Sequence, residues 1–328
     1  MSAEITRRGL LKAGMIAGVG LYGLDKLGSG AGGRAPKQFK AHSLKEHLVI
    51  ARGDAAAPED EERVVTQMAY AAIEELGGMG ALVGRGDKVL IKPNMSFDRR
   101  PPFAANTNPW LVAALAEMCL AAGASRVRVL DNPFARDHLP PYRSSGIMQA
   151  AQKAGAEVVF VDPTSFLNVE IPDGLALKSW PFLKEVYFQG ETDVLINVPI
   201  AKDHGRTRLS LSMKNVMGMT DGERGALHVD IHRKLADLNK IAKVDLTVLD
   251  AYRILRKHGP TGGRLSDVDN STENARRIVA CADRVSVDAY ATTLFGLKPE
   301  DIGYIAEAHK AGIGRMDWNA RSVKEISI

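Results

Sequence analysis

The chain has 328 residues, 45% hydrophobic and 25% charged, so it can bury a core and is not a disordered chain. Its formal charge of +4 comes mostly from residues 1–35, which hold five basic and two acidic side chains. The rest of the chain is therefore nearly neutral, and aromatic residues make up only 6% of the sequence. This composition argues against a broad nucleic-acid-binding surface, and no nucleic-acid partner is expected.

Residues 1–35 have the pattern of an N-terminal targeting signal. Arg7 and Arg8 precede two leucines and a lysine, and a glycine-interrupted apolar run follows at residues 13–24. This order resembles a twin-arginine export signal, and the run is too short and too glycine-rich for a spanning helix. The resemblance implies the twin-arginine translocase as a partner and a periplasmic or otherwise exported protein. No clear cleavage site is visible, so a protein tethered to the membrane by an uncleaved signal stays open.

After a linker at residues 36–44, residues 45–328 alternate strand-like and helix-like patterns. Strands are predicted at residues 47–51, 88–92, 127–130, 157–161, 193–198, 246–249 and 278–280. Helices are predicted at residues 59–76, 109–122, 142–154, 285–294 and 299–311, the second with Asn108 as N-cap and Pro109 at its first position. Prolines interrupt residues 162–190, which are expected to form an irregular insertion with short strands. The pattern predicts an α/β fold of three layers, with helices on both faces of a mostly parallel sheet, built as one unit or two lobes.

The chain has two cysteines, Cys119 and Cys281, and neither belongs to a CxxC motif. An iron–sulfur cluster needs about four thiolates, so no self-contained cluster is expected. Buried free thiols are favoured over a disulfide, which an exported protein could nevertheless form.

Polar residues follow several of the predicted strands. Lys92 and Asn94 follow one strand, Asp131 the next, Asn197 another, and Asp250 a fourth. Ligands of open α/β sheets bind at the carboxyl edge, where such residues meet. Turn chemistry explains any single case equally well, but the four together favour a site at this edge.

Residues 197–218 combine an imidazole, His204, with the ammonium groups of Lys202 and Lys214 and the amide of Asn215 in a segment expected to be rich in loops. Lysines here could hold an anion or, when desolvated, attack a carbonyl. His204 could act as a base or a ligand, and a solvated basic loop is the alternative.

His228 and His232 are four residues apart, so they would share one face of a helix and could bind a metal ion. The glutamate of the HExxH motif is absent, so a simple surface pair is the alternative.

These motifs resemble the family known as domain of unknown function 362, over residue 45 to the C-terminus. The resemblance rests on residues 89–94, 106–109, 197–199 with Lys202 and His204, 214–218, and Asp283 with residues 287–289. It supports the α/β fold and implies no particular reaction. Such proteins often carry either a cysteine module or an export signal, and this chain resembles the second kind, so redox chemistry would need a separate electron-transfer partner or a cofactor not held by thiolates.

A more remote resemblance links His204, Gly205, Lys214, Asn215 and Gly218 to the nickel-pincer lactate racemases. It implies that Lys214 could carry a cofactor, that His204 or His228 acts as ligand or acid/base, and that the substrate is a small 2-hydroxy acid.

The sequence thus predicts an exported, enzyme-like α/β protein that binds a small anionic ligand, or a metal or organic cofactor, at the carboxyl edge of its sheet. Whether it is catalytic is left open. A non-catalytic periplasmic binding or metal-carrier protein is the alternative, as is an accessory subunit of a redox system. The residues expected to do the chemistry are His204, Lys214 and Lys202. Those expected to bind the ligand or cofactor are Lys92, Asn94, Asn197, Asn215, Asp250 and Asp288, the last of which could instead cap a helix. Those expected to bind a metal are His228 and His232.

Overall fold

The central sheet of the computed structural model has eleven strands among the described residues, which are 42–54 and 58–328. The export signal predicted at residues 1–35 and most of the linker lie outside this range. The main path through the sheet runs β13 (Ser322–Ser327), β1 (His47–Arg52), β12 (Arg277–Cys281), β10 (Leu246–Leu255), β7 (Val194–Val198), β2 (Lys88–Pro93), β3 (Arg126–Val129) and β4 (Glu157–Val158).

Most strand pairs are parallel, from β4 through β3, β2 and β7 to β10. β12 runs antiparallel to both of its neighbours, and β13 lies parallel to β1 at the edge. The central strands β2, β7 and β12 are buried almost throughout, as expected for apolar runs covered on both faces. The predicted mostly parallel sheet is therefore confirmed.

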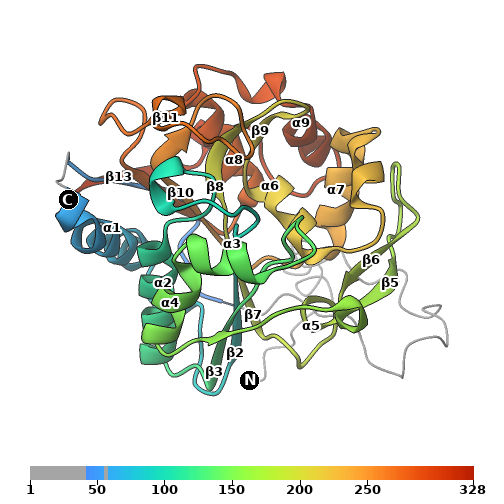
Figure 1. Cartoon of the computed structure of the whole chain (residues 1–328), viewed down its shortest axis with the longest axis horizontal. Coiled ribbons are helices and arrows are strands. Elements are labelled where there is room, and N and C mark those ends of the chain that lie inside the picture. The colour runs from blue at the N-terminus through green and yellow to red at the C-terminus, as the bar shows by residue number, and fades with distance from the viewer. Residues whose placement is uncertain (1–41, 55–57) are drawn as a thin grey trace, which may run out of the picture. The chain divides into compact units, whose positions relative to one another are not determined.

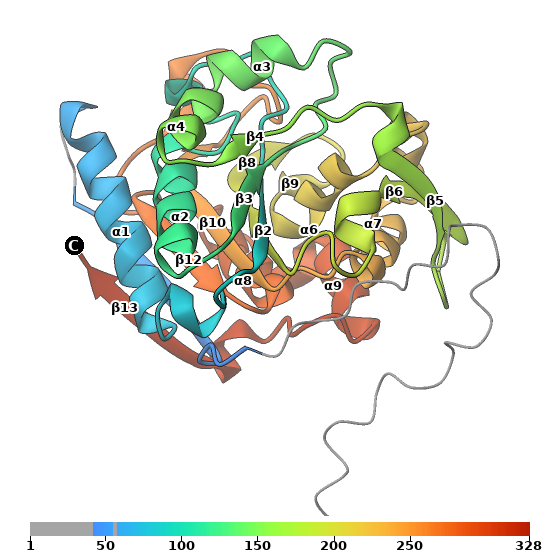
Figure 2. The same ribbon diagram turned by 90° about the horizontal axis from the view of Figure 1, so that it is seen from below.

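Helices cover both faces of this sheet (Figures 1 and 2). On one face, α1 (Glu61–Glu75), α2 (Pro109–Ala121), α3 (Leu139–Ser144) and α4 (Ile147–Lys153) pack into one apolar core. On the other face lie α6 (Ser212–Asn215), α7 (Ile231–Ile241), α8 (Arg284–Thr293) and α9 (Gly303–Lys310). This is the predicted three-layer α/β fold, and the described residues belong to one compact unit.

The predicted insertion is an antiparallel pair, β5 (Phe166–Glu170) and β6 (Ser179–Leu183), followed by the single turn α5 (Lys184–Tyr187). The Asp237 carboxylate of α7 accepts three backbone N–H groups, from Leu175, Ala176 and Leu177, at 2.7–2.9 Å. This one buried side chain ties the insertion to the helical layer.

Three local predictions were wrong. Residues 197–218 are not rich in loops, because β8 (Ile200–His204) and β9 (Arg208–Ser210) form a hairpin beside β10, and α6 follows. The helix expected at 142–154 is split at Gly146, whose positive φ of 74° ends α3 before α4 begins. β10 extends to Leu255, six residues beyond its predicted end, and pairs with the two-residue strand β11 (Val268–Asp269).

Short 3-10 helices connect several of these elements, at Pro58–Asp60, Met79–Ala81, Pro101–Phe103, Pro163–Ser165, Val216–Met219, Arg224–His228, Leu265–Asp267, Pro299–Asp301 and Trp318–Ala320. Within the described ranges, no helix has the length and apolar character needed to cross a membrane.

Candidate functional site

The order of strands reverses between β2 and β7. From β2 the chain continues through α2 to β3 on one side, whereas from β7 it continues through α6 and α7 to β10 on the other. Because α2 and α6 pack on opposite faces, their connections diverge at the carboxyl ends of β2 and β7, the place where open α/β sheets bind ligands. The polar strand ends predicted from the sequence meet here.

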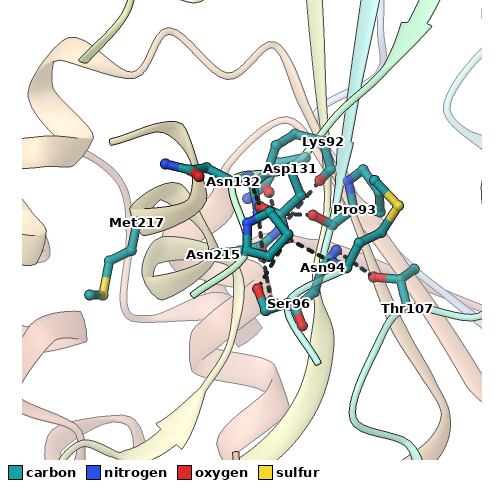
Figure 3. A network of polar contacts seen from close by, with 12 residues as sticks. Lys92, Pro93, Asn94, Ser96, Thr107, Asp131, Asn132, Asn215 and Met217 are labelled. Carbon is teal, nitrogen blue, oxygen red and sulfur yellow. Dashed lines mark hydrogen bonds and ion pairs between the residues drawn. The ribbon is translucent and has the colours of Figure 1, made fainter. Parts of the chain in front are cut away.

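At this edge of the sheet Lys92 and Asp131 form a buried ion pair (Figure 3). Lys92 Nζ lies 2.8 Å from Asp131 Oδ1, and the two side chains are 1% and 0% exposed. The other carboxylate oxygen accepts the Met95 N–H at 2.8 Å and the Ser96 hydroxyl at 3.1 Å. Burial lowers the pKa of Lys92, and Asp131 opposes that shift by stabilising the ammonium.

Three asparagines surround this pair, and their side-chain amides form hydrogen bonds with one another. Asn215 Oδ1 accepts from Lys92 Nζ at 2.8 Å and from Asn94 Nδ2 at 3.1 Å. Asn215 Nδ2 donates to Asn197 Oδ1 at 2.8 Å, and Asn197 Nδ2 donates to the Ser212 carbonyl at 2.9 Å. The amides therefore tie β2, β7 and α6 together and hold the Lys92 ammonium in place.

Lys202, from β8, is 1% exposed and continues the network. Its Nζ donates to Asn94 Oδ1 at 2.9 Å and to the Ala105 carbonyl at 2.7 Å, and it lies 4.6 Å from the centroid of the Phe97 ring. Burial, with the nearby charge of Lys214, lowers its pKa well below the usual range. All these partners are neutral, so its charge is not offset by a carboxylate in direct contact.

Lys214, on α6, is partly exposed, and its Nζ donates to the Met217 sulfur at 3.7 Å. Burial lowers the pKa of Lys214 to about 8. Among the described residues it forms none of the ion pairs of this site, whereas Lys92 is paired with Asp131.

His204 and His228 stack beside Lys214, with ring centroids 6.0 Å apart and planes 11° from parallel. His204 Nδ1 accepts the N–H groups of Arg206 and Thr207 at 3.2 and 3.4 Å, so the neutral ring carries its proton on Nε2. Burial, together with the charge of Lys214, lowers the pKa of His204 to about 3. Both effects also lower the pKa of His228, so the two imidazoles are neutral near pH 7.

Arg224 completes the set of cations, although nothing in its sequence surroundings marked it. Its guanidinium donates to the carbonyls of Asn132 and Pro133 at 2.7 and 2.6 Å and lies over the exposed ring of Phe134. Burial lowers the pKa of Arg224, and Asp131 and Asp221 oppose this shift. We call the four cations Lys92, Lys202, Lys214 and Arg224 the cationic cluster.

Two predicted ligand-binding carboxylates instead hold backbone amides. Asp250 accepts the N–H groups of Asn108 and Tyr252 at 2.7 and 3.0 Å, and burial raises its pKa to about 6. Asp288 accepts those of Ser212 and Met213 at 2.8 and 2.9 Å, and burial raises its pKa to about 7. Asp288 does cap a helix, but that helix is α6.

The prediction that His228 and His232 lie on one face of the same helix was wrong. Asp230 has a left-handed φ of 54°, so the 3-10 helix ends at His228 and α7 begins anew at Ile231. His232 stacks on Tyr304 at 6.3 Å, away from the stack of His204 and His228. Within residues 42–54 and 58–328, no group of three or more His, Cys, Asp or Glu side chains is arranged to hold a metal ion.

Both cysteines are free and buried. Burial raises the pKa of Cys119 to about 12 and that of Cys281 to about 11, so both are protonated thiols at neutral pH.

Sequence reasoning missed Asp131 as a site residue, although the strand-end rule had already singled it out. It also did not explain why residue 218 is a glycine. A Cβ there would overlap Asp131 Oδ1 and the Lys92 ammonium, so only glycine lets this backbone lie against the ion pair.

The four residues of the cationic cluster and the asparagines around them lie in a region of the chain that matches one protein family. Residues 89–293, more than half of the chain, match the family described as domain of unknown function (DUF362), and the chain belongs to this family. The match begins in β2 and ends with α8, so it includes the whole cationic cluster.

A thylakoid-associated protein of Synechocystis sp. is 26% identical over 256 residues, which cover 74% of this chain and 73% of that protein. A crystal structure of a Thermotoga maritima protein aligns with a TM-score of 0.34 at 10% identity. That alignment covers 60% of this chain and 52% of the other, so the chain spans about half the length of the solved protein.

Proposed function

We propose that this protein binds a small anionic ligand at the cationic cluster. The observation that supports it is the charge balance of the cluster. Four cationic side chains gather near two carboxylates, Asp131, which is already paired with Lys92, and Asp221, which lies near Arg224. Buried cations without a counter-ion are costly, and a bound anion would offset that cost.

Proton transfer to the bound ligand is the second part of the proposal. Lys214, with a pKa near 8, exchanges its proton close to neutral pH, and His204, neutral there with its proton on Nε2, offers the ligand a hydrogen-bond donor. A small 2-hydroxy acid is the substrate class that suits this pair and the surrounding cations. Asn94, Asn197 and Asn215 would act as positioning residues, because their polar atoms already bond to one another or to the lysines.

The test compares Lys214→Ala and His204→Ala with the unmodified protein, using titration calorimetry with inorganic phosphate and with L-lactate. Binding of both probes should be lost in each variant. Lys214→Ala should keep the thermal unfolding midpoint of the parent, whereas His204→Ala, which leaves the Arg206 and Thr207 N–H groups without their acceptor, should lower it while the chain still folds. Lys153→Ala is the matched control, because that side chain is 79% exposed and distant in sequence from the cluster. Unchanged affinity in both site variants would rule out the proposed site.

Turnover distinguishes an enzyme from a non-catalytic carrier that uses the same cluster. L-lactate recovered unchanged, at one equivalent per chain, favours the carrier. Formation of D-lactate favours the enzyme.

We further propose that the protein is exported through the twin-arginine pathway, an assignment that rests on Arg7 and Arg8. The thylakoid association of the cyanobacterial relative is compatible with a protein that works at or beyond a membrane. The full chain with Arg7→Lys and Arg8→Lys should accumulate in the cytoplasm of a bacterium that has this pathway, as cell fractionation would measure. Export that is indifferent to the double substitution would contradict the assignment.

A further inference from the structure

The three lysines of the cationic cluster differ in what their amines contact. The Lys92 amine is held by Asp131, by the Pro93 carbonyl and by Asn215, all at 2.8 Å. The Lys202 amine is held by an amide oxygen and a carbonyl. The hydrogen bond that the structure gives the Lys214 amine ends on a thioether sulfur, which is a weak acceptor.

This difference has a chemical consequence. An ammonium paired with a carboxylate, as in Lys92, keeps its protons and has no lone pair to offer. The pKa of Lys202 is lowered too, but its amine is fully buried and donates to two oxygens. An amine that is desolvated, near other cations and weakly hydrogen-bonded loses its proton more readily and becomes a nucleophile. Lys214 is also partly exposed, whereas Lys92 and Lys202 are fully buried, so Lys214 is the most accessible of these three lysines.

The backbone that carries Lys214 is fixed from two sides. Asp288 holds the N–H groups at the start of α6, and Asn239 Nδ2 donates to the Met213 carbonyl at 3.0 Å. His204 lies close enough for the Lys214 charge to lower its pKa, and its protonated Nε2 provides a donor beside the amine. A nucleophile and a nearby hydrogen-bond donor are thus held on rigid elements.

We infer that Lys214 forms an imine with a small 2-oxo acid, whose carboxylate is held by the remaining charge of the cationic cluster. This inference rests on the proposed anion binding and specifies its ligand. The neutral Lys214 amine adds to the carbonyl carbon, and one of its two protons passes to the carbonyl oxygen to give a neutral carbinolamine, while His204 Nε2 donates a hydrogen bond to that oxygen. The carbinolamine then loses its hydroxyl as water, using the proton that leaves the nitrogen, and no oxidant or reductant is required.

The test traps the imine by reduction. The full chain is incubated with pyruvate and sodium cyanoborohydride, which reduces the C=N bond to a stable secondary amine. Intact mass should increase by the mass of pyruvic acid less one oxygen atom, in one copy, and peptide mapping should place it on Lys214. Lys214→Arg keeps the positive charge but has no amine that forms an imine under these conditions, so it should lose the adduct and still bind pyruvate in calorimetry.

Lys153→Arg controls for unselective modification of exposed amines and should retain the full adduct. An adduct that persists in Lys214→Arg, or that is spread over exposed lysines, would overturn the inference. Pyruvate binding without any adduct would also overturn it while leaving the proposed anion site intact. Absence of both binding and adduct would overturn the anion site as well.

Discussion

The Lys92 and Asp131 side chains are the residues on which the rest of the site is built. Replacing Lys92 by Met keeps the length of the side chain but leaves the Asp131 carboxylate buried without its cation. Removing one partner of a buried pair costs about 3–5 kcal/mol, so we expect a loss of this size in the free energy of unfolding. Urea denaturation of Lys92→Met would measure it.

The double variant Lys92→Met, Asp131→Asn is the control for this prediction, because it removes both charges together. It should be more stable than Lys92→Met alone, since no unpaired charge remains buried. If the loss in free energy of unfolding of the double variant equalled the sum of the losses of the two single variants, the two charges would not stabilise each other.

His204 makes a separate prediction about pH. Its pKa falls from an ordinary 6.5 to about 3 on folding, so the unfolded chain takes up this proton first as the pH drops. Stability that depends on neutral His204 is complete above pH 6.5 and is lost toward pH 3, by roughly 1 kcal/mol per pH unit. His204→Asn retains an acceptor for the two backbone N–H groups and should flatten this slope in urea denaturation, whereas His309→Asn, at an exposed site, should not.

The residues of the site that a single rule predicts from the sequence are those that follow a predicted strand. Lys92, Asn94 and Asn197 follow apolar strands, and the carboxyl-edge rule places such residues together. Arg224 lies in a 3-10 helix without any periodic pattern, so only the folded chain brings it to the cluster.

Among the elements, α6 is a single turn whose position depends on a side chain from another helix. Asp288→Ala leaves the N–H groups of Ser212 and Met213 without an acceptor, at a cost of about 1–3 kcal/mol. Because α6 carries Lys214, affinity for phosphate should fall along with stability. Calorimetry and urea denaturation of the same sample would measure both.

Asp283→Ala is the matched control at the element scale. Asp283 caps α8 itself, accepting the N–H groups of Val285 and Ser286, and touches no residue of the cationic cluster. It should reduce stability without weakening phosphate binding. Equal losses of affinity in both variants would mean that α6 has no special role.

Elements with a continuous apolar pattern were predictable, and those with polar side chains in buried strands were not. β2 and β7 are runs of apolar residues and were located within a residue of their observed ends. β8 buries Lys202 and His204, so its sequence resembles a polar loop, and its pairing with β10 depends on a partner about fifty residues away.

At the scale of the whole molecule, the alternation of patterns was sufficient to predict three layers. The order of the strands was not predictable, because no local signal states that β7 lies beside β2. That adjacency creates the reversal of strand order, and with it the sheet edge where the cationic cluster forms.

The most direct test of the account is the pH dependence of sulfate affinity, because the charge of sulfate is constant from pH 6 to 10. Lys214 loses its proton as the pH rises through about 8, so calorimetry should show sulfate affinity falling above that pH. Lys214→Arg, which stays charged, should bind sulfate with little dependence on pH. Affinity of the unmodified protein that does not change over this range, or no sulfate binding at any pH, would contradict an anion site built around Lys214.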